Sequence, residues 1–291
     1  MRQFWKFAKP KGPGFGISKS FYLSVLAGSP ALPPITGIIN PKGTNGALEG
    51  FGVPLVDGKD KAILDSPMLR GTYALASKDQ KTVVRLMVMS AEEAGFSPDR
   101  IATSPMAALL SPELLIQLRS TWHLLQLSFE SHDPDVYPAL DFLLGIATRL
   151  GEATQAIIAD PLAERYVVPD QLIMRPRSDP NVDAREHVFI HRRQDGDKWH
   201  IFTKGLIKIL QPEMELLDVE EQDQDEAARF LISASQGVFQ GYLVQNGSEV
   251  GPFEARQGGH MKSIGPNDAM VMELLPPTGK TVSDLLKMPF D

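Results

Sequence analysis

Three histidines lie close together in the sequence, and they are the residues whose types and spacing could support chemistry. His187, His191 and His200 fall within residues 187–205, where two runs of alternating apolar and polar residues flank Asp195-Gly196. This pattern predicts a β-hairpin, because glycine tolerates the positive φ that a tight two-residue turn requires. With the turn at Asp195-Gly196, His191 is expected opposite His200, about 4.5–5.5 Å away at Cβ. A histidine pair at that distance could share a metal ion or a phosphate group.

The predicted register divides the hairpin into two faces, because side chains alternate along a strand. The apolar face is expected to belong to the core and comprises Val188, Ile190, Trp199 and Ile201. The other face is the candidate ligand face, and its candidate contacts are His187, His191, His200, Arg193 and Lys198, with Phe189 and Phe202 beside them. A metal ion needs further ligands, which this spacing does not place. A half-exposed polar face with incidental histidines is therefore the simpler interpretation.

Two segments resemble phosphate-binding loops but lack the required pattern. Lys11–Ser20 is rich in glycine, yet no strand precedes it and Ser18 stands where the final glycine is needed. Gly279-Lys280-Thr281 has the right ending, but Leu274 occupies the position of the first glycine. The sequence therefore predicts no nucleotide site and no cofactor.

Other polar clusters have structural explanations. Ser131, His132 and Asp133 are neighbours in the sequence. A catalytic triad is recognised by residues that converge in space, so helix capping is the favoured interpretation of these three. The acidic run over residues 213–226 lacks the glycine and the spacing of a calcium loop, and it predicts a solvated strand end and helix start. We therefore predict neither a catalytic residue nor a metal site.

Composition and charge restrict the class of protein. The 291 residues are 43% hydrophobic and 22% charged, which is ordinary for a soluble globular protein. The net charge of −7 argues against general binding to nucleic acids or anionic membranes. The sequence contains no cysteine, which excludes disulfides, thiol nucleophiles and cysteine-ligated zinc. No apolar run reaches the roughly 18 residues of a membrane span, and the basic start lacks the long apolar segment of a secretory signal, so a cytoplasmic location is predicted.

Glycine and proline are frequent at both ends of the chain, and they disfavour long helices and central strands there. We therefore expect residues 1–80 to form an extended N-terminal arm, residues 81–245 an α+β core domain, and residues 246–291 an irregular C-terminal segment. Disordered chains are poor in aromatic residues, so an aromatic-bearing arm is expected to order on a partner. The candidate partner-binding residues of the arm are Phe4, Trp5, Phe7, Phe15, Phe21 and Tyr22.

The central segment has the periodicities of regular structure. Strands are predicted over residues 82–89, 122–129, 155–159 and 213–219, and helices over residues 104–119, 135–150 and 223–239. Together with the hairpin, this order favours an α+β fold, with a mixed, mainly antiparallel sheet and helices packed on one face. Beyond it, we expect a short strand over 269–274 and a short helix over 282–287.

One segment resembles a family signature. From Thr203 to Glu215, a Thr-x-Gly-hydrophobic step precedes a Pro-acidic-hydrophobic-Glu step. This pattern resembles a bacterial domain-of-unknown-function family, the one numbered four-two-six-one, over roughly residues 81–245. Leu210 stands where that family tends to have glycine. The resemblance implies an α+β domain and no established activity. In physical terms, Gly205 can break the strand and Thr203 can cap the turn that follows.

The sequence favours a non-enzymatic protein-interaction or structural subunit of a larger assembly, which binds a protein partner or further copies of itself through its terminal arms. The alternative is an enzyme, or a small-ligand or metal binder, that uses the face with His187, His191 and His200 together with Asp160 or a glutamate. A third interpretation is contact between the basic N-terminus and an anionic ligand or a nucleic acid, which would depend steeply on salt.

Overall fold

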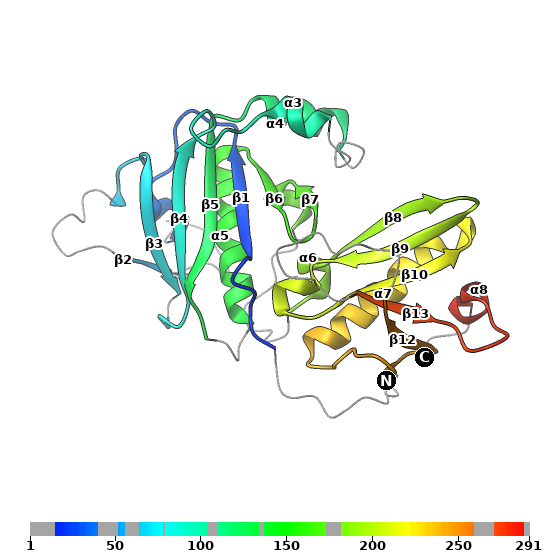
Figure 1. The fold of residues 1–291 in the computed structure, drawn as a ribbon. Helices are drawn as coiled ribbons and strands as arrows, with labels where there is room; N and C mark the ends of the chain where they lie inside the picture. Colours follow the sequence, from blue (N-terminus) through cyan, green and yellow to red (C-terminus); the bar gives the residue numbers. More distant parts are fainter. Residues whose placement is uncertain are drawn as a thin grey trace. The chain divides into compact units, whose positions relative to one another are not determined.

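A computed structural model describes residues 15–39, 52–55, 64–77, 79–103, 110–133, 137–172, 182–258 and 271–287. The chain divides into two compact units. Unit 1 comprises Met1–Ser18, Pro134–Val136 and Asp183–Asp291, and unit 2 comprises Lys19–Asp133 and Tyr137–Val182. Each unit contains one β-sheet with its own helices (Figure 1).

The sheet of unit 2 has seven strands in the order β2-β3-β4-β5-β1-β6-β7, and neighbouring strands are antiparallel. In chain order these strands are β1 (Tyr22–Ala27), β2 (Gly52–Leu55), β3 (Gly71–Ser77), β4 (Val83–Ser90), β5 (His123–Ser131), β6 (Ile157–Asp160) and β7 (Arg165–Val167). β1 pairs with β5 along its whole length, from Tyr22 opposite Ser128 to Ala27 opposite His123. Because β6 pairs with the other edge of β1, this strand lies inside the sheet.

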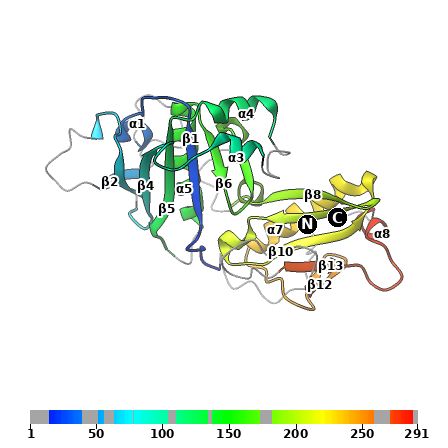
Figure 2. The same cartoon turned by 45° about the horizontal axis from the view of Figure 1, so that its top comes forward.

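The helices of unit 2 bury apolar side chains against the sheet. α5 (Pro138–Thr154) packs on β1, β5 and β6 through residues spaced three and four apart, which are Leu140, Leu143, Ala147, Leu150 and Thr154. α3 (Pro98–Ala102) and α4 (Pro112–Arg119) lie side by side at one end of the sheet (Figure 2). Leu118 of α4 belongs to a hydrophobic cluster with Leu26 and Ile157. Two shorter elements, α1 (Ile35–Ile39) and η2 (Pro169–Gln171), also contact α5.

The sheet of unit 1 has six strands in the order β11-β12-β13-β10-β9-β8. In chain order these are β8 (Phe189–Asp195), β9 (Lys198–Lys204), β10 (Glu213–Val219), β11 (Glu249–Val250), β12 (Phe253–Gln257) and β13 (Val271–Leu275). β10 and β13 are parallel, and the other paired strands are antiparallel.

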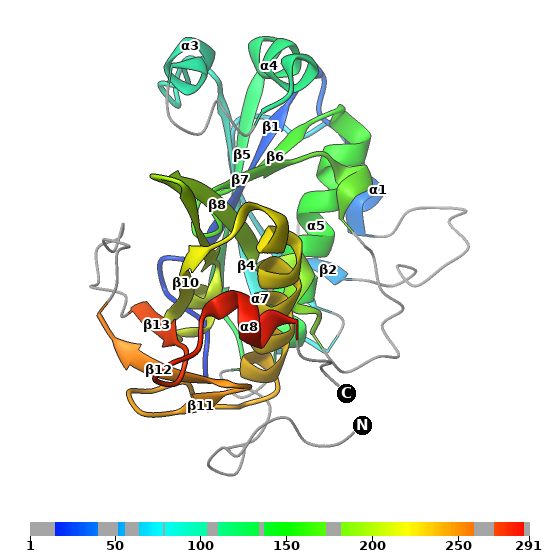
Figure 3. The same cartoon turned by 90° about the vertical axis from the view of Figure 1, so that its right-hand side faces the viewer.

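One long helix covers this sheet. α7 (Gln224–Phe239) packs on β8, β9 and β10, and its buried residues include Ala227, Leu231, Ala234 and Val238, at helical spacing (Figure 3). Asp225 and Glu226 lie in its first turn, where negative charge stabilises a helix. α8 (Val282–Leu286) contacts α7 and β10, and α6 (Ala184–His187) contacts α7. The 3-10 helices η3 (Leu206–Ile209) and η4 (Glu221–Asp223) flank β10.

The predicted fold class is confirmed, because both units combine helices with a mainly antiparallel sheet. The predicted strand 213–219 coincides with β10, and the predicted strand 82–89 differs from β4 by one residue at each end. The predicted helices 135–150 and 223–239 correspond to α5 and α7. Strong periodicity in the sequence therefore identified the long elements of the chain.

The expectation of an extended N-terminal arm over residues 1–80 differs from the structure. The described residues of this stretch that lie beyond Ser18 contribute β1, α1, β2 and β3 to unit 2. The reason is local: the run Tyr22–Ala27 contains neither glycine nor proline, so it forms a strand despite the composition around it. Averaging composition over the first 60 residues concealed this run.

The expected boundary between a core domain at 81–245 and an irregular segment at 246–291 also differs from the structure. Residues 81–245 are divided between both units, and β11, β12, β13 and α8 complete the sheet and helices of unit 1. None of the described helices is both long enough and apolar enough to cross a membrane.

Candidate functional site

The hairpin forms, but its turn begins one residue later than predicted, so the cross-strand register differs by two residues. Asp195 pairs with Lys198, so the two loop residues are Gly196 and Asp197. Gly196 has φ +64°, which suits the first loop position of a type II′ turn. The prediction placed glycine second in the loop, and that choice moved every cross-strand partner by two residues.

The predicted His191–His200 pair is therefore wrong. His191 lies opposite Phe202, and the two rings stack with centroids 5.3 Å apart and planes 12° apart. His200 lies opposite Arg193. The two histidines still share a sheet face with Phe202, as predicted, because residues 191 and 193 of β8 pair with residues 202 and 200 of β9. This face is more buried than expected, since His191, His200 and Phe202 are all buried.

Arg193, His200 and Glu215 form a continuous chain of hydrogen bonds. The distance from Arg193 Nη2 to His200 Nδ1 is 3.0 Å, and that from His200 Nε2 to Glu215 Oε2 is 2.7 Å. A guanidinium group only donates, so Nδ1 accepts and the imidazole proton resides on Nε2, which donates to Glu215. Both ring nitrogens of His200 are engaged. The arrangement holds the buried Glu215 carboxylate and presents no histidine lone pair to a metal ion.

A second buried carboxylate, Glu213, organises the connection between β9 and β10. Its Oε1 accepts from the backbone N–H of Gly205 at 2.8 Å and of Ile207 at 3.1 Å, and its Oε2 accepts from Thr203 Oγ1 at 2.7 Å. Burial raises the pKa of the Glu213 carboxyl above its usual range, and these hydrogen bonds act in the opposite direction. The hydrogen bonds of Glu213 thus join the Thr-x-Gly and Pro-Glu steps of the sequence signature; we call this arrangement the Glu213 bracket.

The same connection is joined to the end of α6. Lys208 is almost fully buried, and its Nζ donates to the carbonyl oxygen of His187 at 2.6 Å. Gly205 has φ +123°, and a Cβ at this position would lie 2.2 Å from the same carbonyl oxygen. Only glycine fits there, both for its conformation and for its space. These contacts assign a structural role to Gly205 and Lys208.

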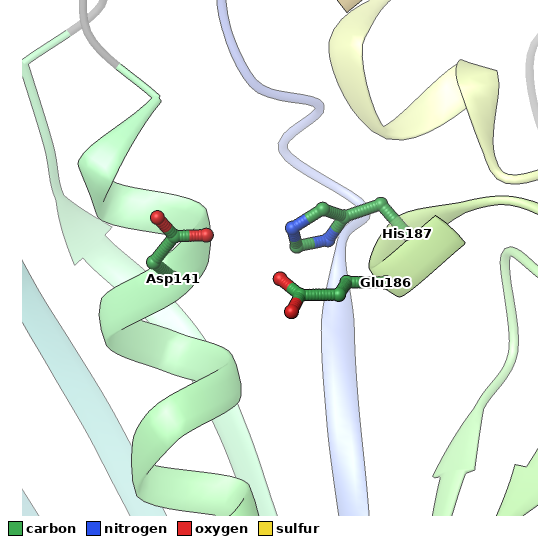
Figure 4. A group of neighbouring side chains, drawn as sticks. All are labelled: Asp141, Glu186 and His187. Carbon is green, nitrogen blue, oxygen red and sulfur yellow. The ribbon is translucent and has the colours of Figure 1, made fainter. Parts of the chain in front are cut away.

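The remaining candidate ligand residues belong to different elements of the described structure. His187 lies in α6, not on a strand, and its ring centroid is 5.7 Å from that of Phe239. Glu186 and His187 are neighbours at the end of α6 (Figure 4); Asp141, also drawn there, belongs to unit 2. Lys198 forms a surface ion pair with Glu220 at 2.6 Å. Asp160, considered as a further acid, bonds to Ala163 and Arg165 within unit 2.

The proposed arm residues have different fates. Phe4, Trp5 and Phe7 lie outside the described residues. Phe15 is half-buried in unit 1. Phe21 is buried in unit 2, 6.0 Å from the Phe129 ring, and Tyr22 begins β1. Phe21 and Tyr22 therefore belong to a folded sheet and not to an arm.

The structure exposes three large apolar side chains of unit 2 that the sequence did not indicate. We call Leu69, Ile116 and Trp122 the strand-end surface; their exposed fractions are 74%, 66% and 58%. Leu69 precedes β3 and Trp122 precedes β5, and both flank the connection that follows β4. In that connection the Ala91 N–H donates to the Trp122 carbonyl at 2.9 Å, and Glu93 pairs with Arg70 at 2.7 Å.

Ile116 is placed by α4, the helix that leads into β5. Ser111 caps this helix by accepting from the Leu114 N–H, and Pro112 occupies its first turn. Leu118 anchors the inner side of α4 in the cluster with Leu26 and Ile157, which leaves Ile116 facing outward. The signal available in the sequence was an isoleucine and a tryptophan among several leucines, which does not distinguish exposed from buried apolar residues.

Comparisons with known proteins found no match among protein-family models, curated proteins or solved structures. The resemblance to the family numbered four-two-six-one therefore stays a prediction.

Proposed function

We propose that this chain is a non-enzymatic protein-interaction subunit of a cytoplasmic assembly, and that it binds its partner through the strand-end surface. The observation that supports this most directly is the exposure of Trp122, Ile116 and Leu69 on the ordered end of one sheet. Large apolar side chains exposed singly are common, but several on one rigid support are typical of interaction sites.

The chemistry of these side chains suits protein recognition. Tryptophan buries a large apolar area on binding and is enriched among the residues that dominate interface energies. The ion pairs Arg70–Glu93 and Arg119–Asp99 flank the apolar residues on the same connections and helices. An apolar centre with a charged rim matches the anatomy of protein–protein interfaces.

The polar groups of the hairpin support the non-enzymatic part of the proposal. Arg193, His200 and Glu215 bond to one another, and the hydroxyl of Thr203 donates to Glu213. A general base would need to reach a substrate or a nucleophile, and a nucleophile would need an adjacent base. These hydrogen bonds instead hold strands and connections together.

Site-directed photo-crosslinking tests the proposal. A photoreactive amino acid at position 116 is expected to give one reproducible adduct with a protein partner, or with a second copy of the chain, in the source cell. Position 229 is the matched control, because Arg229 is exposed on α7 of the other unit. Adducts at position 229 alone, or at neither position, would contradict the proposal.

The aromatic N-terminal residues Phe4, Trp5 and Phe7 are proposed as a second contact with the same partner. Deletion of residues 1–14 should then weaken the assembly, as measured by size-exclusion chromatography with light scattering, without removing the adduct at position 116. An unchanged assembly would remove the arm from the proposal and leave the strand-end surface in it.

A small-ligand binder is the second candidate, and one observation favours it. The Arg193 side chain is exposed while it donates to the buried His200, so an anion could compete for its guanidinium. Arg193→Gln should then abolish anion binding, whereas the matched variant Arg192→Gln should not.

A further inference from the structure

Arg149, on α5, is a buried cation for which the described residues supply no partner. The residue is only 7% exposed. Its Nε atom is buried and has no hydrogen-bond partner. Within the described part of the chain, Arg149 makes no hydrogen bond and no ion pair. The other buried arginine of unit 2, Arg165, pairs with Asp160 at 3.4 Å.

The cost of this arrangement is unusual for a folded protein. Buried charges are normally paired, because removal from water is repaid only by an opposite charge or by hydrogen bonds. Guanidinium has five N–H donors and cannot lose its charge under ordinary conditions. Burial lowers the pKa of Arg149, and Glu152, three residues further along the helix, acts weakly in the opposite direction. That glutamate is exposed and is not ion-paired with Arg149 in the described structure.

The stripe of α5 that carries Arg149 also carries a glycine and a buried aromatic ring. A helical side chain leans toward the N-terminus of its helix and covers the residue four positions earlier. That residue is Gly145, which has no side chain, and one turn further back lies the buried Phe142. An apolar wall beside a cation keeps water away and strengthens its attraction for an anion.

We propose that Arg149 binds an oxyanion group, a phosphate or a carboxylate, at this face of α5. The planar guanidinium matches both groups with two parallel hydrogen bonds. The bound anion would supply an acceptor that the described residues do not supply to Arg149 Nε. This site is independent of the strand-end surface, so either proposal can fail without the other.

The test compares melting of the full-length protein in chloride, phosphate and acetate at equal ionic strength. Saturable stabilisation is expected from phosphate, from acetate or from both, because a ligand that binds only the native state raises the melting midpoint. A response to phosphate alone identifies a phosphate site, and a response to acetate alone identifies a carboxylate site.

Arg149→Met supplies the decisive variant, because methionine keeps the apolar stem and removes the charge. In chloride this variant is expected to melt above the wild type, since it removes an unpaired buried charge. Its affinity for the anion should fall by at least about tenfold. Arg149→Lys keeps the positive charge but loses the paired N–H donors of the guanidinium, so its affinity for the anion should be intermediate. Arg229→Gln is the matched control, because Arg229 is exposed on α7 of the other unit, and it should retain wild-type binding.

Two results would overturn the proposal. One is a wild-type midpoint that neither phosphate nor acetate raises above chloride. The other is an equal anion response in the wild type and in Arg149→Met, which would mean an adventitious ion only. If Arg149→Met does not fold, the ¹⁵Nε–H resonance of Arg149 in the wild type decides the question. It should shift saturably with phosphate or acetate, and an unchanged resonance would reject the site.

Discussion

The buried carboxylates of β10 in unit 1 and the buried Arg149 of unit 2 are treated in opposite ways. In unit 1, Glu213 accepts three hydrogen bonds, and Glu215 accepts from His200. In unit 2, Arg149 is also buried but finds no acceptor in the described structure. Removing either charge from water costs free energy, and only in the first arrangement do hydrogen bonds within the described chain offset that cost. The difference teaches that satisfied buried charge in this protein marks architecture, whereas unsatisfied buried charge marks a candidate site.

The same contrast holds for apolar side chains. The hairpin of unit 1 encloses its aromatic rings, because His191 stacks on Phe202 and both are buried. The end of the sheet in unit 2 leaves Trp122 and Leu69 in water. A region that has closed on itself is less suited to recognition than one that keeps large apolar groups exposed.

A substitution at Gly205, within the Glu213 bracket, should have the largest effect on stability. Gly205→Ala places a Cβ 2.2 Å from the His187 carbonyl oxygen at φ +123°, so it combines a clash with backbone strain. We expect a loss of about 4 kcal/mol in the free energy of unfolding, measured by urea denaturation. Gly247→Ala is the matched control, because Gly247 has φ +83° but no atom near the added Cβ. It should cost about 1 kcal/mol; equal losses for the two variants would refute the close approach.

The contribution of the buried Glu213 to stability should depend on pH. Burial raises its pKa above the ordinary value of 4.5, so the native state binds this proton more tightly than the unfolded state. The associated stabilisation is fully present below the unfolded pKa and is lost as pH rises through the folded pKa. Glu213→Gln removes this dependence.

Urea titrations at a series of pH values measure this effect. The free energy of unfolding of the wild type, minus that of Glu213→Gln, should fall as pH rises from below 4.5 toward neutrality. A difference that increases over that range would show that the hydrogen bonds from Thr203, Gly205 and Ile207 outweigh desolvation and lower the pKa.

The smallest effect is expected at the surface of the hairpin. Lys198 pairs with Glu220, but both side chains remain solvated, and exposed ion pairs contribute little. Lys198→Gln should leave the melting midpoint unchanged within error. A clear loss would mean that the outer part of this face is also structural.

The sequence predicted the long elements well and the cross-strand contacts poorly. Periodic apolar residues identified α5 and α7, because a helix face must repeat every three to four residues. The hairpin was located correctly, yet the position of glycine within its turn decided every pairing. The strand β1 was missed, because its apolar run was judged together with the glycine and proline around it.

The candidate sites lay beyond what sequence patterns can specify. The histidines were recognised as a group, but His200 Nδ1 meets Arg193 and not His191. Nothing in the sequence distinguishes Arg149, without an acceptor, from Arg165, which pairs with Asp160. Exposure of Trp122 likewise depends on how α4 and β5 meet. Such properties arise from long-range packing.

Native mass spectrometry of the protein isolated from its source tests the central proposal most directly. The wild type is expected to appear in a defined assembly with another protein or with its own copies. The double variant Ile116→Ser/Trp122→Ser should appear as a folded monomer, because both exposed side chains are lost without disturbing Leu118 beneath them. A monomeric wild type, or an identical assembly formed by the double variant, would contradict the account.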